Sequence, residues 1–195
     1  MRHQPITIMK KSSLFLITLL ISATAFSQGF TPPAEGNAVV YFVRVSGYGG
    51  AVSFEYFHNE EFIGVFKGKN YMRYECPAGK NLLWASSEDK EFLNCDLKAG
   101  ETYIVLVNIE MGAFKARIGL EPLTVDNPDF ERAKDLVLNK KPVETPQSKI
   151  DETTKKLEKK GFIEEMMQRY ESEWKDAKNT QTITPEMYIP RDKLQ

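Results

Sequence analysis

Residues 71–109 of the chain read YMRYECPAGK NLLWASSEDK EFLNCDLKAG ETYIVLVNI. The strand-like runs in this segment are 71–76, 81–86, 92–97 and 103–109. In the first run, Met72, Tyr74 and Cys76 fall on one face, and polar residues alternate with them. Alternation with a period of two predicts strands that have one buried and one solvated face. The last run is apolar on both faces apart from Asn108, so we expect a central strand covered on both sides.

The rest of the first two thirds of the chain shows the same pattern. Further strands are expected at 38–45, 52–58, 62–66 and 114–120. Short strands at such regular spacing are typical of a sandwich or barrel. The sequence therefore predicts a mainly β fold, an antiparallel β-sandwich over residues 38–123.

The composition changes after residue 123, and we expect an α-helical C-terminal extension over residues 127–178. Ile163, Met167, Tyr170 and Trp174 recur at helical spacing and form one apolar stripe. Residues 179–195 show no periodicity, so a flexible tail is expected there.

Three partners could cover the apolar stripe: the protein's own sandwich, a helix of another chain, or a membrane surface. A membrane-surface helix favours a basic polar face. Here Glu164, Glu165, Glu171 and Glu173 dominate that face. Packing on the sandwich is the favoured interpretation, and an assembly role through this helix is the alternative.

The N-terminal segment, residues 1–27, has the pattern of a secretory signal peptide. Lys10 and Lys11 precede an apolar run at 14–25, and residues 25–27 form a small-x-small cleavage site. The apolar run is too short to span a bilayer, and no later run is long enough. The residue directly after the cleavage site is Gln28 and not cysteine, so we expect no lipid anchor. The expected location is periplasmic or extracellular, with a mature protein that is soluble and not membrane-spanning.

The charge balance excludes one class of function. The chain has 26 basic and 27 acidic residues, and the leader contains three of the basic ones, so the mature chain would carry 23 − 27 = −4. A general nucleic-acid-binding protein needs a basic face. Nucleic acid is therefore not an expected partner.

Cys76 and Cys95 are the only cysteines, and both lie on the inward-facing parity of their strands. In an oxidising compartment such a pair favours a disulfide, which would close a loop of about twenty residues. The alternative is two buried thiols on strands that do not face each other. The alternation of residues is compatible with both alternatives, because it shows which face each cysteine occupies but not which residues of two strands lie opposite each other.

No motif in the chain predicts catalysis, a metal site or a cofactor. His58 is the only histidine after the leader, and no close pair of zinc ligands accompanies it, so we interpret it as a turn residue. The glycine-rich loop at 47–50 lacks the Lys-Ser/Thr of a phosphate loop and precedes a strand. Its Tyr48 has little reason to be buried among glycines and is a candidate for a binding surface. Paired glutamates such as Glu60 and Glu61 are typical of solvated turns.

Several segments of the β region resemble a bacterial family known as domain of unknown function 2846. They are the VYFVR run at 40–44, the hairpin FHNEEFIG at 57–64, the Pro-Ala-Gly turn at 77–79, the AGETY segment at 99–103 and Met111-Gly112. The resemblance covers residues 38–123 and implies an exported bacterial domain, similar to prealbumin-like or PEGA-like sandwiches. It implies no activity and no site residues.

These observations together predict an exported, non-enzymatic module that binds or supports a protein or another component of the cell envelope. The alternatives are an envelope enzyme that uses carboxylates, and an assembly protein that uses the C-terminal helix. The candidate binding surface comprises Tyr48, Ile163, Met167, Tyr170 and Trp174.

Overall fold

The structure is a computed structural model that describes residues 29–111, 116–176 and 180–195. Within these residues the protein is mainly β with helices toward the C-terminus, as the sequence predicts. The strands are β1 (Asn37–Arg44), β2 (Ser53–His58), β3 (Glu61–Lys67), β4 (Asn70–Pro77), β5 (Gly79–Ser86), β6 (Lys90–Leu97), β7 (Thr102–Met111), β8 (Ala116–Leu123) and β9 (Gln181–Ile183). The helices are α1 (Phe130–Asn139), α2 (Gln147–Lys159) and α3 (Phe162–Arg169), with a π-helical turn η1 (Tyr170–Trp174) and short 3-10 turns η2 (Pro185–Met187) and η3 (Arg191–Lys193).

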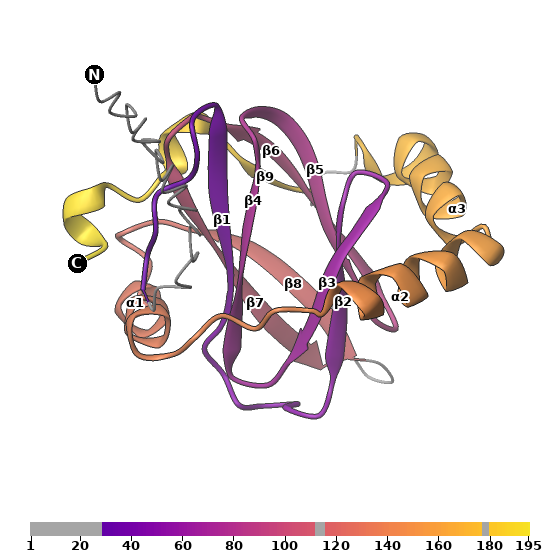
Figure 1. Cartoon of the computed structure of the whole chain (residues 1–195), viewed down its shortest axis with the longest axis horizontal. Coiled ribbons are helices and arrows are strands. Elements are labelled where there is room, and N and C mark those ends of the chain that lie inside the picture. Colours follow the sequence, from indigo (N-terminus) through magenta and orange to yellow (C-terminus); the bar gives the residue numbers. More distant parts are fainter. Residues whose placement is uncertain (1–28, 112–115, 177–179) are drawn as a thin grey trace, which may run out of the picture.

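The strands form two sheets that pack face to face (Figure 1). One sheet has the order β4-β1-β7-β8, and the other has the order β3-β2-β5-β6-β9. The predicted antiparallel pairing is wrong at two places, because β1 pairs with β7 and β6 pairs with β9 in parallel. Both sheets are therefore mixed. Each parallel pair joins strands far apart in the sequence, so no local turn signal could indicate it.

Alternate residues of the strands fill the space between the sheets. On β1, Val40 and Phe42 point into this core, whereas Val39, Tyr41 and Val43 point to the outer face. The outer residues are buried as well, because further elements cover both sheets. The strand β7 lies between β1 and β8. Its inward-facing Val105 is 0% exposed and its outward-facing Ile104 is 1% exposed, which confirms that the strand is central and covered on both sides.

Helix α1 and the C-terminal segment cover the outer face of the first sheet. Phe130, Ala133 and Val137 of α1 pack against the outer residues of β1 and β7. The Tyr71 hydroxyl on β4 donates to the carbonyl of Lys140, 3.0 Å away, and so ties the end of α1 to the sheet. Burial raises the pKa of Tyr71 to about 12, and the hydroxyl stays protonated as a donor.

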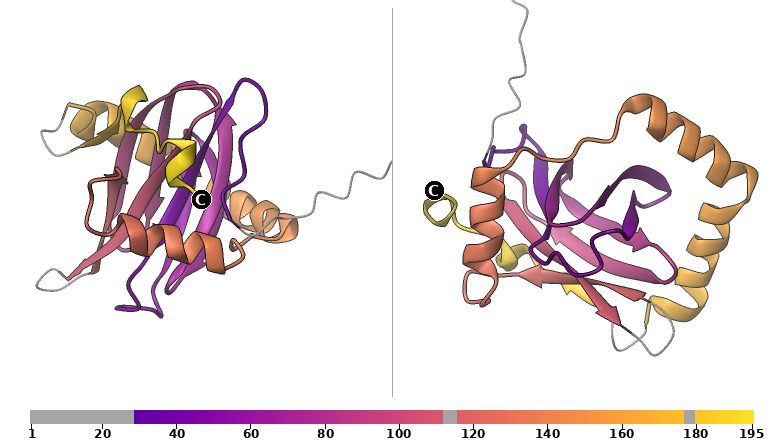
Figure 2. Two further views of the ribbon diagram at one scale, coloured as in Figure 1. Left: turned by 90° about the vertical axis from the view of Figure 1, so that its left-hand side faces the viewer. Right: turned by 90° about the horizontal axis from the view of Figure 1, so that it is seen from below.

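Helices α2 and α3 cover the outer face of the second sheet, on the side of the molecule opposite α1 (Figure 2). Their Leu157 and Met166 pack on an aromatic layer formed by Phe57, Trp84 and Phe92. The rings of Phe57 and Trp84 stack at a centroid distance of 3.8 Å. The predicted helical extension is thus divided between the two outer faces of the sandwich.

A strap, residues 141–146, runs from α1 to α2 and crosses the edge where β3 and β4 adjoin. The Thr145 hydroxyl accepts a hydrogen bond from the Val65 N–H (2.9 Å) and donates to the Val65 carbonyl (3.4 Å). The Val143 N–H donates to the Tyr71 carbonyl at 2.8 Å. These bonds occupy backbone groups of two edge strands that another strand could otherwise pair with.

Gly64 permits this close approach, because a Cβ there would lie 2.9 Å from both the Met72 Sδ and the Thr145 Oγ1. We expect Gly64→Ala to lower the free energy of unfolding by about 1–3 kcal/mol, since the strap or Met72 would have to shift. Denaturant titration would measure the change. Gly47→Ala, where nothing lies within 4 Å of the added Cβ, is the control and should be neutral within about 0.5 kcal/mol. Equal stabilities of the two variants would contradict the role assigned to the strap.

The C-terminal segment is not the flexible tail that the sequence predicts. Strand β9 pairs with β6, and Ile183 enters the core between the sheets with 1% of its surface exposed. Beyond it, Ile189 packs on the outer face of the first sheet, and its N–H donates to the Thr102 carbonyl at 2.8 Å. The segment lacks periodicity because its apolar residues are divided between two clusters, Ile183 in the core between the sheets and Ile189 and Leu194 on the outer face of the first sheet.

Parts of several predictions fall outside the described residues. They are the signal peptide at 1–27, Gly112 of the family resemblance, the first two residues of the strand predicted at 114–120, the last two of the helical extension predicted at 127–178 and the first of the tail predicted at 179–195. Over the ranges that the structure describes, no helix has the length and apolar character needed to cross a bilayer.

Candidate functional site

A cavity lies between the β2–β3 turn and the helical segment α3–η1. Its volume is about 650 Å³. The lining residues are His58, Asn59, Glu60, Glu61, Lys80, Asn81, Leu82, Met167, Tyr170, Glu171 and Lys175. Leu82 and Met167 supply apolar surface, and the other side chains are polar or charged.

The β2–β3 turn is held rigidly on β5. Asn59 adopts a left-handed conformation with φ 51°, which asparagine tolerates better than most residues. Its backbone N–H donates to the Leu82 carbonyl (2.7 Å), and its side-chain oxygen accepts from the Leu82 N–H (3.1 Å). The indole of Trp84 donates to the Asn59 carbonyl (2.8 Å). One wall of the cavity is therefore rigid before any ligand arrives.

The hydrogen bonds of His58 determine which ring nitrogen carries the proton. The Asn81 amide nitrogen donates to the carbonyls of Pro77 and Gly79, which leaves its oxygen as the acceptor facing His58. His58 Nε2 therefore donates to this oxygen (2.8 Å) and also lies 3.3 Å from the Asn59 side-chain nitrogen, and Nδ1 is hydrogen-bonded to the Tyr74 hydroxyl (2.9 Å). Burial raises the pKa of Tyr74, so this hydroxyl remains a donor.

Because both nitrogens of His58 are occupied, the ring serves to brace the cavity wall. The sequence predicted a turn residue, and the structure places His58 at the end of β2, with the turn directly after it. Its bracing role depends on Tyr74 and Asn81, which lie on other strands.

The opposite wall comes from η1, where the helix widens by one residue and the Lys175 N–H bonds to the Tyr170 carbonyl (2.8 Å). Such π-helical turns often occur at functional sites. The Tyr170 hydroxyl donates to the side-chain oxygen of Asn94 on β6, which fixes the helix on the sheet. Burial raises the Tyr170 pKa. Lys175 and Glu171 form an ion pair at 2.8 Å, and this contact raises the Lys175 pKa.

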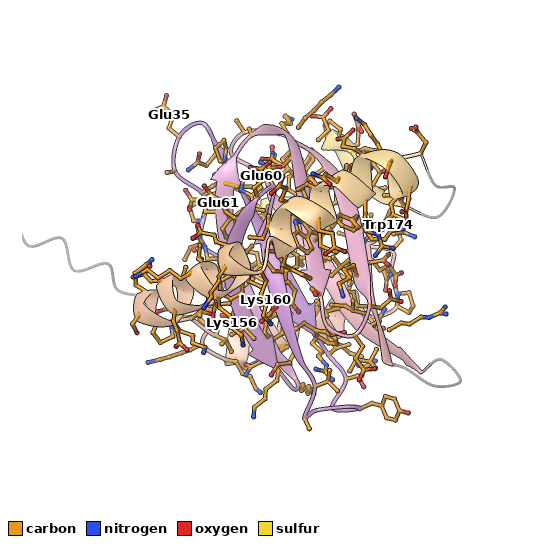
Figure 3. The ribbon with its side chains drawn as sticks, turned by 90° about the vertical axis from the view of Figure 1, so that its right-hand side faces the viewer. Glu35, Glu60, Glu61, Lys156, Lys160 and Trp174 are labelled. Carbon is orange, nitrogen blue, oxygen red and sulfur yellow. The ribbon has the colours of Figure 1, made fainter. Side chains whose placement is uncertain are left out.

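A second hollow, of about 540 Å³, adjoins the cavity and shares Glu60 and Met167 with it. It follows the corner between α2 and α3, where Glu158, Ile163 and Glu164 contribute to its walls. We refer to the cavity and this hollow together as the groove. Five glutamates and two lysines line the groove, so carboxylates outnumber ammonium groups there. Among described residues, Glu60 and Glu61 have no ion-pair partner. Figure 3 shows Glu60 and Glu61 on one side of the α2–α3 corner.

The apolar stripe packs on the protein's own sheet. Tyr170 is 6% exposed, and Ile163, Met167 and Trp174 are partly buried against the aromatic layer of the second sheet. Of these four, Met167 and Tyr170 line the cavity and Ile163 lines the adjoining hollow. The rings of Trp174 and Phe92 are in tilted contact, with their centroids 5.1 Å apart.

Tyr48 is not part of the groove. It is 60% exposed, as expected, but it lies in the loop before β2, whereas the groove begins beyond the other end of that strand. Its loop is anchored by Arg44, whose buried guanidinium donates to the carbonyls of Tyr48, Gly49 and Val52. The structure thus separates Tyr48 from the other predicted binding residues.

Cys76 and Cys95 are free, buried thiols whose side chains enter the core between the sheets from opposite sides, Cys76 from β4 and Cys95 from β6. The predicted inward orientation of both cysteines is confirmed. Of the two alternatives, the structure has the one without a disulfide. Burial raises the pKa of Cys76 to about 11 and that of Cys95 further, so both stay protonated at neutral pH.

Among the described residues, no three His, Cys, Asp or Glu side chains converge to hold a metal ion. Two described carboxyl groups, those of Glu75 and Glu186, have a lowered pKa. For Glu75, burial opposes the change, but hydrogen bonds from Asn37, the Ala34 N–H and Arg73 outweigh it. Neither group lines the groove.

No protein-family model matches the chain, and no curated protein is significantly similar to it. The resemblance to domain of unknown function 2846 therefore stays a prediction.

Proposed function

We propose that the protein is an exported, non-enzymatic binding module that holds an extended segment of a protein of the cell envelope in the groove. The groove itself carries the proposal, because its two connected hollows provide an elongated site on a rigid sandwich. Rigid walls reduce the conformational entropy that the protein loses when it binds a partner.

The chemistry of the groove indicates what the segment carries. Leu82, Ile163 and Met167 offer apolar contacts along its length. The carboxylates of Glu60 and Glu61 favour lysine or arginine side chains on the bound segment. An extended segment with basic and apolar residues fits both features.

Two observations support binding over the alternatives. A carboxylate enzyme needs a general acid with a raised pKa. The carboxyl groups of Glu75 and Glu186 are shifted in the opposite direction, to a lower pKa, and neither lines the groove. An assembly helix needs a free apolar face, whereas Tyr170 and the rest of the stripe pack on the aromatic layer.

Site-specific photo-crosslinking in the producing cells would test the function. A photoreactive residue at Glu60, in the groove, is expected to give a discrete adduct with one protein. The same residue at Glu131, exposed on α1 across the molecule, is the matched control and should not give it. The adduct at Glu60 should disappear when Met167 is replaced by Arg, which fills the junction of the two hollows with a like charge for a basic segment. Absence of an adduct at Glu60, or the same adduct at both positions, would contradict the proposal.

A further inference from the structure

The C-terminal half of α2 carries Lys155, Lys156 and Lys159, and Lys160 follows directly after the helix. We call them the lysine patch. At 3.6 residues per turn they occupy an arc of about 140° on one side of the helix. All four are exposed, whereas Thr153 and Leu157 face the sheet.

The patch is not neutralised by the described residues around it. No carboxylate among them forms an ion pair with the four ammonium groups. The acidic residues of α2 have other contacts: Asp151 accepts a hydrogen bond from Gln147, Glu152 pairs with Lys149, and Glu158 lines the groove. Lys90 of β6 adds another positive charge nearby, because its Nζ lies 5.7 Å from the ring centre of Phe162.

Like charges four residues apart destabilise a helix slightly, so intrinsic helix stability does not favour this arrangement. Their position near the helix C-terminus offsets part of that cost. Charge segregation is the clearer feature. Lys156 and Lys160 lie on the side of α2 opposite Glu60 and Glu61 (Figure 3).

The composition of the patch indicates the kind of partner. Protein interfaces are enriched in aromatic residues and arginine and depleted in lysine. Single-stranded nucleic acids need stacking platforms. The exposed large hydrophobic residues of the described chain are Tyr48 and Val125, and neither belongs to α2 or α3. Lysines that no exposed large hydrophobic side chain accompanies suit attraction to a diffuse anionic surface, where each ammonium group keeps its hydration.

We propose that the lysine patch docks the protein on an anionic phospholipid surface. The association is peripheral and electrostatic, because no exposed apolar side chain accompanies the patch into the bilayer. In this orientation the groove lies on the other side of α2, away from the lipid, and remains open to a partner. The inference is independent of what the groove binds.

Co-sedimentation of the full chain with vesicles would test it. We expect binding to vesicles of phosphatidylcholine mixed with phosphatidylglycerol, and none to phosphatidylcholine alone. Replacing all four patch lysines with Gln should weaken binding by more than about tenfold. Raising the salt concentration should also release the protein, since the Debye length falls from about 30 Å at 0.01 M to about 8 Å at 0.15 M.

The matched control replaces four exposed lysines elsewhere, Lys67, Lys69, Lys141 and Lys193, with Gln and changes the net charge equally. This variant should retain most of the binding, and thermal melts should show that both variants are folded. No binding of the wild type at low salt, or an equal loss in the two variants, would overturn the proposal. Binding of the wild type to soluble polyglutamate but not to the anionic vesicles, at the same salt concentration, would assign the patch to an acidic protein and would also overturn the proposal.

Discussion

Replacing Val105 with Asp is expected to abolish the folded state at physiological temperature. Val105 lies on β7, between β1 and β8, and is 0% exposed in the core between the sheets. A carboxylate there would lose its hydration and gain no partner, which costs several kcal/mol. The whole stability of a domain is about 5–15 kcal/mol.

Equilibrium denaturation and circular dichroism would measure the loss. Ser53→Asp is the control, because it introduces the same charge at an exposed position on β2 and should change the stability by no more than about 0.5 kcal/mol. A melting temperature of the Val105 variant equal to that of the wild type would show that β7 is not the central strand.

Removing residues 180–195 is expected to have an effect of similar size. The deletion would uncover the sites that Ile183, Ile189 and Leu194 fill, and all three side chains are buried. Full burial of such side chains contributes about 1.5–3 kcal/mol each, partly offset by the entropy of ordering the segment. Tyr103 would also lose the carbonyl of Pro185, to which its hydroxyl donates.

A point substitution separates loss of packing from truncation itself. Ile183→Ala should lower the free energy of unfolding by about 2–5 kcal/mol, whereas Thr182→Ala, at an exposed position of the same strand, should have little effect. Had the segment been the flexible tail that the sequence suggests, neither the deletion nor Ile183→Ala would alter the melting temperature.

The candidate site could be predicted only in fragments. The helical spacing of Met167 and Tyr170 indicates an apolar stripe, whereas Glu60 is interpreted from the sequence only as a solvated turn residue. The groove exists because α3 lies beside the β2–β3 turn, more than a hundred residues away in sequence. No periodicity within either segment encodes that contact.

The network around His58 shows the same limit. The sequence identified a lone histidine beside a turn, without metal or catalytic partners. Its function as a brace depends on Tyr74 and Asn81, which reach it from β4 and β5. Hydrogen bonds between distant strands depend on register, and a shift of one residue would turn either side chain to the other face.

The sequence by itself determined the eight strands of the sandwich, because the alternation of apolar and polar residues and the turn residues between strands are local signals that extend over only a few residues. It also determined the inward orientation of Cys76 and Cys95 and the apolar faces of α1 and α3. The tertiary structure alone decided the parallel pairing of β1 with β7, the docking of residues 180–195 and the course of the strap over Gly64. These features depend on contacts between segments that are remote in the chain. Such contacts stabilise the protein only once the whole core has assembled.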